Sequence, residues 1–172
     1  MNNNHQIRRF EITLEFLKQE LPPPAKILDL GVRNSFSEWM EKAGYEVVNT
    51  GGEDVDFDVS AVQKDGFDAV TAFEIIEHLV NPMPLLAAIK APRLIATIPM
   101  RLWFASAYRN KNDIRDQHYH EFEDWQFDWL VEKAGWKIEG RKKWTSPPSF
   151  PNGIRPILRY FTPRYYGISA RR

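Results

Sequence analysis

The feature that most constrains the fold is the alternation of short apolar segments with amphipathic segments along the chain. Strand-like segments cover residues 26–30, 45–49, 54–59, 67–73, 94–98, 136–143 and 165–170. Segments with helical spacing of apolar residues cover 7–21, 35–43, 82–90 and 121–134. Strands that alternate with helices predict an α/β protein, a three-layer αβα sandwich with a Rossmann-like, mostly parallel sheet.

Proline and glycine mark the ends of these segments. The run 22–24 is three prolines, which end the first helix because proline cannot donate to the helix ladder. Four further prolines predict an irregular connection before the last strand: Pro147, Pro148, Pro151 and Pro156. We expect one domain over residues 1–172, with an N-terminal helix within 1–24 and a basic, aromatic segment over 145–172.

Composition excludes several classes of protein. The 172 residues are 43% hydrophobic, which is enough to build a core and argues against general disorder. The chain has no cysteine, so disulfide scaffolds, thiolate catalysis and iron–sulfur clusters are excluded. No apolar run reaches the length of a transmembrane helix, and residues 1–10 lack the apolar core of a secretory signal. We therefore expect a cytoplasmic protein.

Charge is distributed unevenly although the formal net charge is zero. Residues 141–172 contain eight Lys or Arg and no acidic residue, so this segment carries +8 and the rest of the chain −8. Two interpretations are open: the segment contacts an anionic surface, or it folds back on the acidic body of its own chain. The chain has no recognised nucleic-acid-binding motif.

Parallel sheets bind ligands at the carboxyl ends of their strands. In this chain, polar or glycine residues follow the predicted strands at Asp29, Gly31, Asp58 and Glu74. Each has a structural alternative: Asp29 and Gly31 form a strand-end turn, Asp58 protects a sheet edge, and Glu74 caps a helix.

Three segments together resemble the class I S-adenosylmethionine-dependent methyltransferases. The first is Lys26-Ile-Leu-Asp-Leu-Gly31, and the second is Phe67-Asp-Ala-Val-Thr-Ala-Phe-Glu-Ile-Ile-Glu-His-Leu79 followed by Asn81-Pro82. The third is Gln117-His-Tyr-His-Glu-Phe122 with the helix that leads to Gly135. The resemblance implies a class I methyltransferase fold, S-adenosyl-L-methionine as cofactor, and methyl transfer to a small-molecule, sugar or lipid substrate.

The same resemblance assigns cofactor binding to the strand-end residues. The candidates are Asp29, Gly31, Arg33, Ser35, Asp58 and Glu74. A glycine at position 31 would let the backbone approach the ligand closely.

Two departures from the family pattern concern this site. The family loop reads Asp/Glu-x-Gly-x-Gly-x-Gly, but the second and third glycines are Arg33 and Ser35 here. The second strand ends in Asn49 rather than in the acid that binds ribose, and too few residues follow it for the usual helix. These departures make a catalytically inactive methyltransferase-like binding or scaffold module the main alternative function.

Histidines supply the candidate catalytic groups, because imidazole titrates near neutral pH and can accept a proton from the methyl acceptor. The candidates are His78, His118 and His120. Asp116 with the last two also offers metal-ligand atoms, but we assign no metal to the chain. A third alternative, another nucleotide-binding α/β protein, lacks the expected Gly-x-Gly-x-x-Gly or Gly-Lys-Ser/Thr loop.

Overall fold

The computed structural model describes residues 3–113, 116–146 and 153–172, and six strands in this part of the chain form one sheet. Its order is β2-β1-β3-β4-β6-β5. The strands are β1 (Lys26–Asp29), β2 (Glu46–Asn49), β3 (Ala69–Phe73), β4 (Arg93–Pro99), β5 (Lys137–Trp144) and β6 (Tyr165–Arg171). β1 to β4 are parallel, and β6 runs antiparallel between β4 and β5. The predicted α/β class is confirmed.

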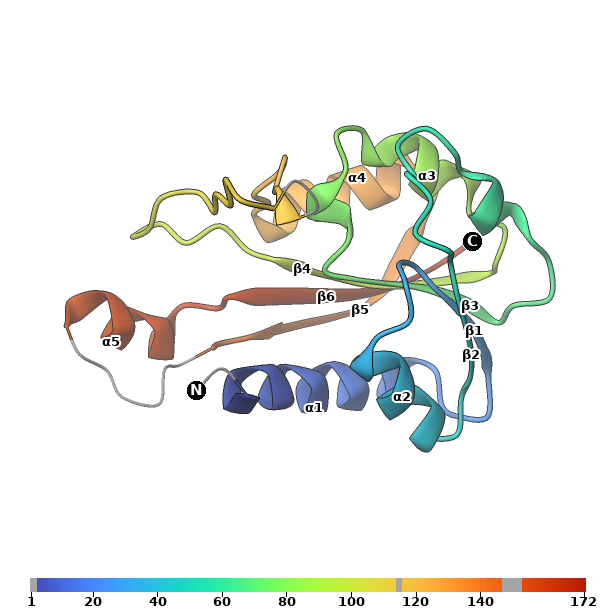
Figure 1. The fold of residues 1–172 in the computed structure, drawn as a ribbon, viewed down its shortest axis with the longest axis horizontal. Helices are drawn as coiled ribbons and strands as arrows, with labels where there is room; N and C mark the ends of the chain where they lie inside the picture. Colours follow the sequence, from blue (N-terminus) through green and yellow to red (C-terminus); the bar gives the residue numbers. More distant parts are fainter. Residues whose placement is uncertain (1–2, 114–115, 147–152) are drawn as a thin grey trace.

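Helices cover both faces of the sheet (Figure 1). One layer is α1 (Asn3–Glu20) with α2 (Ser35–Lys42), and the opposite layer is α3 (Pro82–Ala88) with α4 (Asp124–Lys133). The short 3-10 helices η1 (Ser60–Gln63) and η2 (Ile76–His78) lie in the loops that lead into and out of β3. A last helix, α5 (Ile154–Phe161), lies at one end of the molecule. The predicted three-layer sandwich is therefore present.

The core is split by the sheet into two apolar clusters. Ile27 packs in the cluster formed with α1 and α2, which includes Phe10 and Met40. Its neighbour Leu28 packs in the other cluster, which includes Phe127 of α4. Successive strand residues point to opposite faces, so a strand buried on both sides reads as a continuous apolar run. This explains why the short segment at 26–30 could be recognised as a buried strand.

The basic segment folds back on the acidic body. β6 lies inside the sheet, and Gly167 within it leaves room for Phe16 of α1, whose ring atoms would lie 3.1 Å from a Cβ at that position. Its cations pair with acidic residues elsewhere in the chain. The pairs are Arg141 with Asp128, Lys142 with Glu15, Lys143 with Asp124, and Arg171 with Glu139.

The predicted strand at 54–59 is wrong, because this segment forms turns. Asp54 accepts a hydrogen bond from the Asp56 backbone N–H at 3.1 Å, and Asp58 accepts one from the Ser60 backbone N–H at 2.9 Å. The Asp56 carboxylate accepts from the backbone N–H groups of residues 80 and 81, each at 2.8 Å. Local side-chain acceptors of this kind compete with sheet pairing.

The helix α5 was not predicted from the proline-rich connection. Pro147, Pro148 and Pro151 lie outside the described residues. Pro156 lies in the first turn of α5, where a proline is tolerated because that N–H has no helical partner. Among the described residues, none of the helices combines the length and the apolar character needed to cross a membrane.

We predict that Arg172 stabilises the fold by joining the ends of α3 and α4. Its guanidinium donates to the carbonyls of Leu86, Ala87, Ile89 and Ala134, and it lies 4.4 Å from the centre of the Trp136 ring. Arg172→Ala should lower the free energy of unfolding by about 1–3 kcal/mol in urea titrations. Arg171→Ala removes only an exposed ion pair and should cost less than about 1 kcal/mol. Equal effects of the two variants would contradict this role.

Candidate functional site

A cavity of about 350 Å³ opens at the carboxyl ends of β1, β3 and β4. Its wall includes Arg9, Phe10, Asp29, Gly31, Ser35, Phe36, Phe73, Glu74 and Thr97. The volume lies in the range of about 300–1,000 Å³ that is usual for small-molecule sites. The cavity therefore lies at the sheet edge where the sequence predicts a ligand.

Asp29 is the buried acid of this edge. Its carboxylate accepts from the Thr71 hydroxyl at 2.7 Å and from Asn49 Nδ2 at 2.9 Å, and the Ser37 hydroxyl lies 3.5 Å away. Burial raises the pKa of Asp29 to about 6, although these three hydrogen bonds act in the opposite direction. The residue thus joins β1 to β2, β3 and α2 and also faces the cavity.

The turn after β1 depends on Gly31. This residue has φ +99°, a conformation that side chains with a Cβ rarely adopt. Its N–H donates to the Thr50 hydroxyl at 2.8 Å, while Asn49 binds Asp29 from the end of β2. Asn49 and Thr50 stand where the family has the ribose-binding acid. Through these two hydrogen bonds they hold Asp29 and Gly31 of the turn in place.

Arg33 turns away from the cavity. Its guanidinium forms two hydrogen bonds with the Glu41 carboxylate, at 2.5 and 2.6 Å, on the exposed side of α2. Glu41 raises the pKa of Arg33, and the hydrogen bond from Arg33 lowers the pKa of Glu41, so the pairing favours the charged form of both groups. Ser35, the first residue of α2, does line the cavity. The two residues that replace the family glycines therefore leave the cavity open for different reasons. The Arg33 side chain lies outside the cavity, and the Ser35 side chain lines it but is small.

Glu74 also lines the cavity and has φ +56°, which is rare for a residue with a side chain. Its Oε1 accepts from the Thr97 hydroxyl at 3.0 Å, and its Oε2 lies 3.8 Å from Arg9 Nη1. Burial raises the pKa of Glu74, and the Arg9 charge and the Thr97 hydrogen bond oppose that shift. Backbone strain of this kind is common at binding sites.

Several cavity residues were missed by sequence reasoning, and two of them contact Glu74. Arg9 comes from the middle of α1 and Thr97 from a strand whose motif carries no polar signature. A helix face rich in apolar residues predicts only that α1 packs on the sheet. The helix α1 also brings the Arg9 guanidinium to the cavity at the strand ends. This depends on where α1 lies along the sheet, which the helix pattern does not reveal.

Asp58 lies outside the cavity. Its carboxylate accepts hydrogen bonds from Ser60, and these lower the pKa of Asp58. It lies two residues before η1, and it is not part of the cavity wall that Asp29 and Glu74 line.

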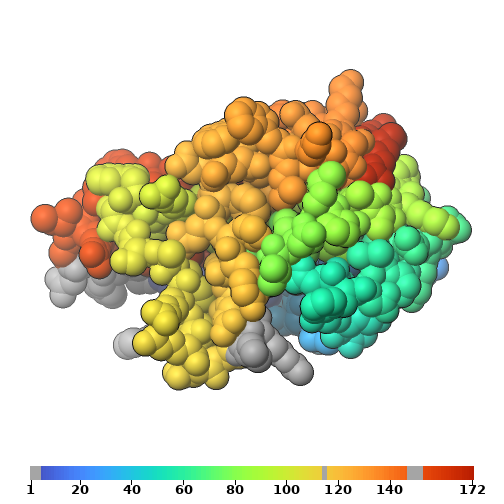
Figure 2. Space-filling model, turned by 90° about the horizontal axis from the view of Figure 1, so that it is seen from above, coloured from blue at the N-terminus to red at the C-terminus, as the bar shows by residue number. Residues whose placement is uncertain are grey.

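Of the three candidate histidines, His118 lines a second hollow of about 390 Å³, and His78 and His120 are not part of its wall. His78 and His118 meet edge to face with ring centres 4.7 Å apart, and burial lowers the pKa of His118. His120 stacks on Phe122 and lies 3.2 Å from the Val80 carbonyl. Figure 2 shows the surface of residues 116–122 lying against that of residues 75–90. The structure brings His78 and His118 together and leaves His120 to one side.

No protein-family model and no curated protein sequence matches this chain. Solved structures do match it in fold. An S-adenosylmethionine-dependent methyltransferase of Mesorhizobium loti is 13% identical, with a TM-score of 0.62 and 99% coverage of both chains. One of Archaeoglobus fulgidus is 16% identical, with a TM-score of 0.58 over 95% of this chain and 94% of that one.

A third solved structure is phosphoethanolamine N-methyltransferase 2 of Haemonchus contortus in complex with S-adenosyl-L-methionine. It is 14% identical with a TM-score of 0.59, over 94% of this chain and 52% of that chain. At such identities the likeness concerns the fold. With its strand order and its antiparallel β6, the chain therefore has the class I methyltransferase fold that its sequence motifs predict.

Proposed function

We propose that this protein is an S-adenosylmethionine-dependent methyltransferase that acts on a small-molecule, sugar or lipid acceptor. The observation that carries this proposal is the open cavity beside the Gly31 turn. An arginine two residues later would fill such a cavity if its side chain pointed inward. Because Arg33 is held by Glu41, space for a ligand is kept at the ends of β1 and β3.

The charges of the cavity fit those of the methyl donor. The donor has a carboxylate, an ammonium and a sulfonium group, so it needs one cationic and at least one anionic partner. Arg9 supplies a guanidinium, which suits a carboxylate, and Asp29 and Glu74 supply carboxylates for the two positive groups. We propose that these three residues hold the amino-acid end of the donor.

The bound donor supplies an electrophilic methyl group, so the protein has mainly to position the reactants and exclude water. Phe10, Phe36 and Phe73 line the cavity and pack against one another, with ring centres of successive pairs 4.8 and 5.3 Å apart. This aromatic wall would shield the reacting atoms. We propose that the acceptor enters from the second hollow, which is lined by Tyr108, Gln117 and His118.

The ionisation of Asp29 predicts the pH dependence of donor binding. At pH 5 about one tenth of a carboxyl group with pKa near 6 is ionised, and at pH 7 about nine tenths. A cationic ligand prefers the ionised form, so affinity for S-adenosylmethionine should rise by about tenfold over this range in calorimetric titrations. Neutral methylthioadenosine, which lacks the amino-acid end, should bind without this dependence.

Absence of any binding heat with S-adenosylmethionine or S-adenosylhomocysteine would overturn the proposed function. Binding without methyl transfer to any member of a panel of hydroxyl and amine acceptors would favour the inactive module instead.

Arg33 and Arg9 form a matched pair for testing where the ligand lies. We predict that Arg33→Ala leaves donor affinity within about twofold, because its side chain is outside the cavity. Arg9→Ala should weaken binding by about tenfold or more, the usual effect of losing a charged hydrogen bond. The measurement is the dissociation constant from calorimetry. If Arg33→Ala weakens binding as much as Arg9→Ala, Arg33 is itself a ligand residue.

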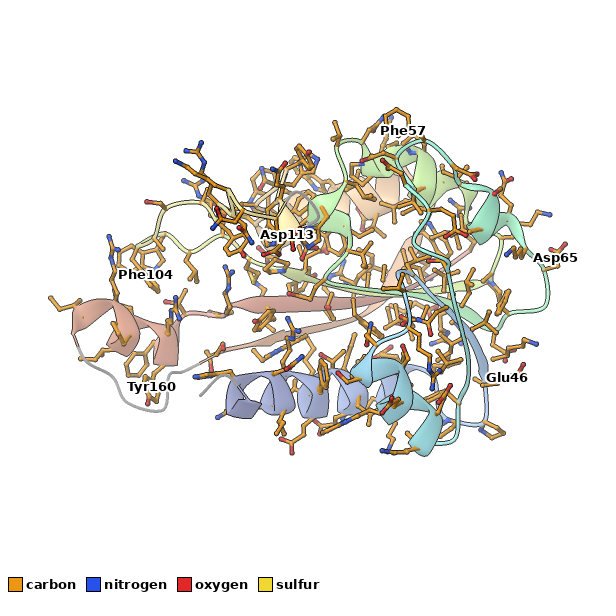
Figure 3. All side chains as sticks on the ribbon, in the orientation of Figure 1. Glu46, Phe57, Asp65, Phe104, Asp113 and Tyr160 are labelled. Atoms are coloured by element: carbon orange, nitrogen blue, oxygen red, sulfur yellow. The ribbon has the colours of Figure 1, made fainter. Side chains whose placement is uncertain are left out.

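We also propose that α5 contacts an anionic lipid surface. Among the described residues, no side chain of this helix is buried, and Ile154 and Phe161 are 78% and 81% exposed. Arg155 and Arg159 lie between these apolar positions. Figure 3 shows Tyr160 of α5 and Phe104 of the loop after β4 at the same end of the molecule. Exposed apolar and basic side chains together suit a membrane interface.

The lipid contact predicts co-sedimentation with vesicles that contain phosphatidylserine and less binding to pure phosphatidylcholine. The double variant Arg155→Glu, Arg159→Glu should abolish sedimentation, because reversed charges are repelled by the anionic surface. Lys64→Glu, on an exposed residue of the loop after η1, changes one charge elsewhere and should retain it. The proposed contact would be contradicted if the Lys64→Glu control lost sedimentation as the double variant does. It would also be contradicted if the wild-type protein did not sediment with the vesicles.

A further inference from the structure

A cluster of metal-ligand side chains lies next to the proposed donor cavity without belonging to its wall. Glu77 and His78 come from η2, and His118 comes from the loop that follows β4. One ligand atom of each residue lies within 4.8 Å of those of the other two. The backbone N–H groups of Tyr119 and His120 donate to the Glu77 carbonyl, at 2.9 and 3.2 Å, and so hold the two segments together.

Glu77 is the unusual member of this cluster. The residue is 1% exposed, and its Oε2 atom has no hydrogen-bond partner among the residues that the structure describes. Its Oε1 atom lies 3.8 Å from His78 Nε2, beyond hydrogen-bond distance. Burying a carboxylate without partners is costly, and the nearby Glu74 carboxylate adds a second charge of the same sign. An additional positive group at this point would remove that cost.

His78 is oriented as a metal-bound histidine is. Its Nδ1 atom lies 3.0 Å from the Gln117 carbonyl oxygen, which can only accept a hydrogen bond. Nδ1 therefore carries the hydrogen, and Nε2 presents its lone pair toward Glu77. A backbone carbonyl on the other ring nitrogen is the usual second partner of a metal-ligating histidine.

We propose that Glu77, His78 and His118 bind a divalent transition-metal ion. Two imidazole nitrogens and one carboxylate oxygen suit Zn²⁺ or Mn²⁺ better than Mg²⁺, which prefers oxygen alone. Ligand atoms around a tetrahedral ion lie about 3.3 Å apart, so the side chains must close inward by about 1.5 Å at most. Both histidines are partly exposed, which leaves coordination positions for water or a substrate.

The surrounding charges favour a cation. Asp116 faces both histidines, Glu121 acts on His118, and Glu74 acts on Glu77. The charges of Arg9 and Arg164 act in the opposite sense on Glu77, and Arg164 also acts on His118. With Glu77 included, four acidic groups face two arginines. Sequence reasoning considered Asp116 with His118 and His120, but the folded chain instead groups His118 with Glu77 and His78.

Metal binding at this site can be tested separately from the proposed methyl transfer, because it is measured without the methyl donor. After treatment with a chelator, the full-length protein is titrated with Mn²⁺, and free Mn²⁺ is followed by electron paramagnetic resonance. We expect one equivalent to bind, with Zn²⁺ competing and Mg²⁺ competing weakly. Zinc X-ray absorption should show two imidazole ligands. Failure of donor binding alone would leave these results unchanged.

Two variants and one control decide the assignment. Glu77→Gln keeps the shape of a buried side chain but lowers its charge, so the protein should fold with an unchanged or higher melting temperature and lose Mn²⁺ affinity by at least about tenfold. His118→Ala should lose it similarly. His120→Ala alters a neighbouring ring outside the cluster and should retain it. No bound equivalent, or affinity equal in wild type, Glu77→Gln and His118→Ala, would overturn the proposal.

Discussion

The carboxylate of Asp29 is the interaction on which the site depends. It ends β1, and its hydrogen bonds reach Thr71 of β3, Asn49 of β2 and Ser37 of α2. A buried carboxylate is tolerated only when donors surround it, so four elements must be in register for this one group to be satisfied. The same register sets the position of the Gly31 turn and hence of the cavity. A constraint on one side chain thus fixes the geometry of the sheet edge.

The uneven charge of the chain has mainly a structural use. Most cations of β5 and β6 pair with acids of α1, α4 and β5, while Arg172 binds backbone carbonyls at the ends of two helices. Exposed pairs of this kind contribute little stability individually. Together they balance the positive charge of β5 and β6 with acidic residues of the same chain. The arginines of α5 differ because they accompany an exposed apolar surface.

Acidic and histidine residues at the strand ends divide into two groups. Asp29 and Glu74 line the cavity with Arg9, whereas Glu77, His78 and His118 form a separate cluster outside its wall. Only two residues separate Glu74 from Glu77 along the chain, yet Glu74 lines the cavity and Glu77 belongs to the cluster with the histidines. This division gives the protein one region suited to a charged organic ligand and another suited to a cation.

The sequence by itself determined the α/β class, most element positions and the strand-end location of Asp29, Gly31 and Glu74. These depend on local periodicity and on the rule that parallel strands end at one edge, both of which are written in neighbouring residues. It did not determine the turns at 54–59, where aspartates bind nearby backbone instead of a sheet. It also did not determine which way Arg33 points, that Arg9 reaches the cavity, or that His118 meets Glu77. Those facts depend on contacts between residues far apart in the chain, and only the packed tertiary structure brings them together.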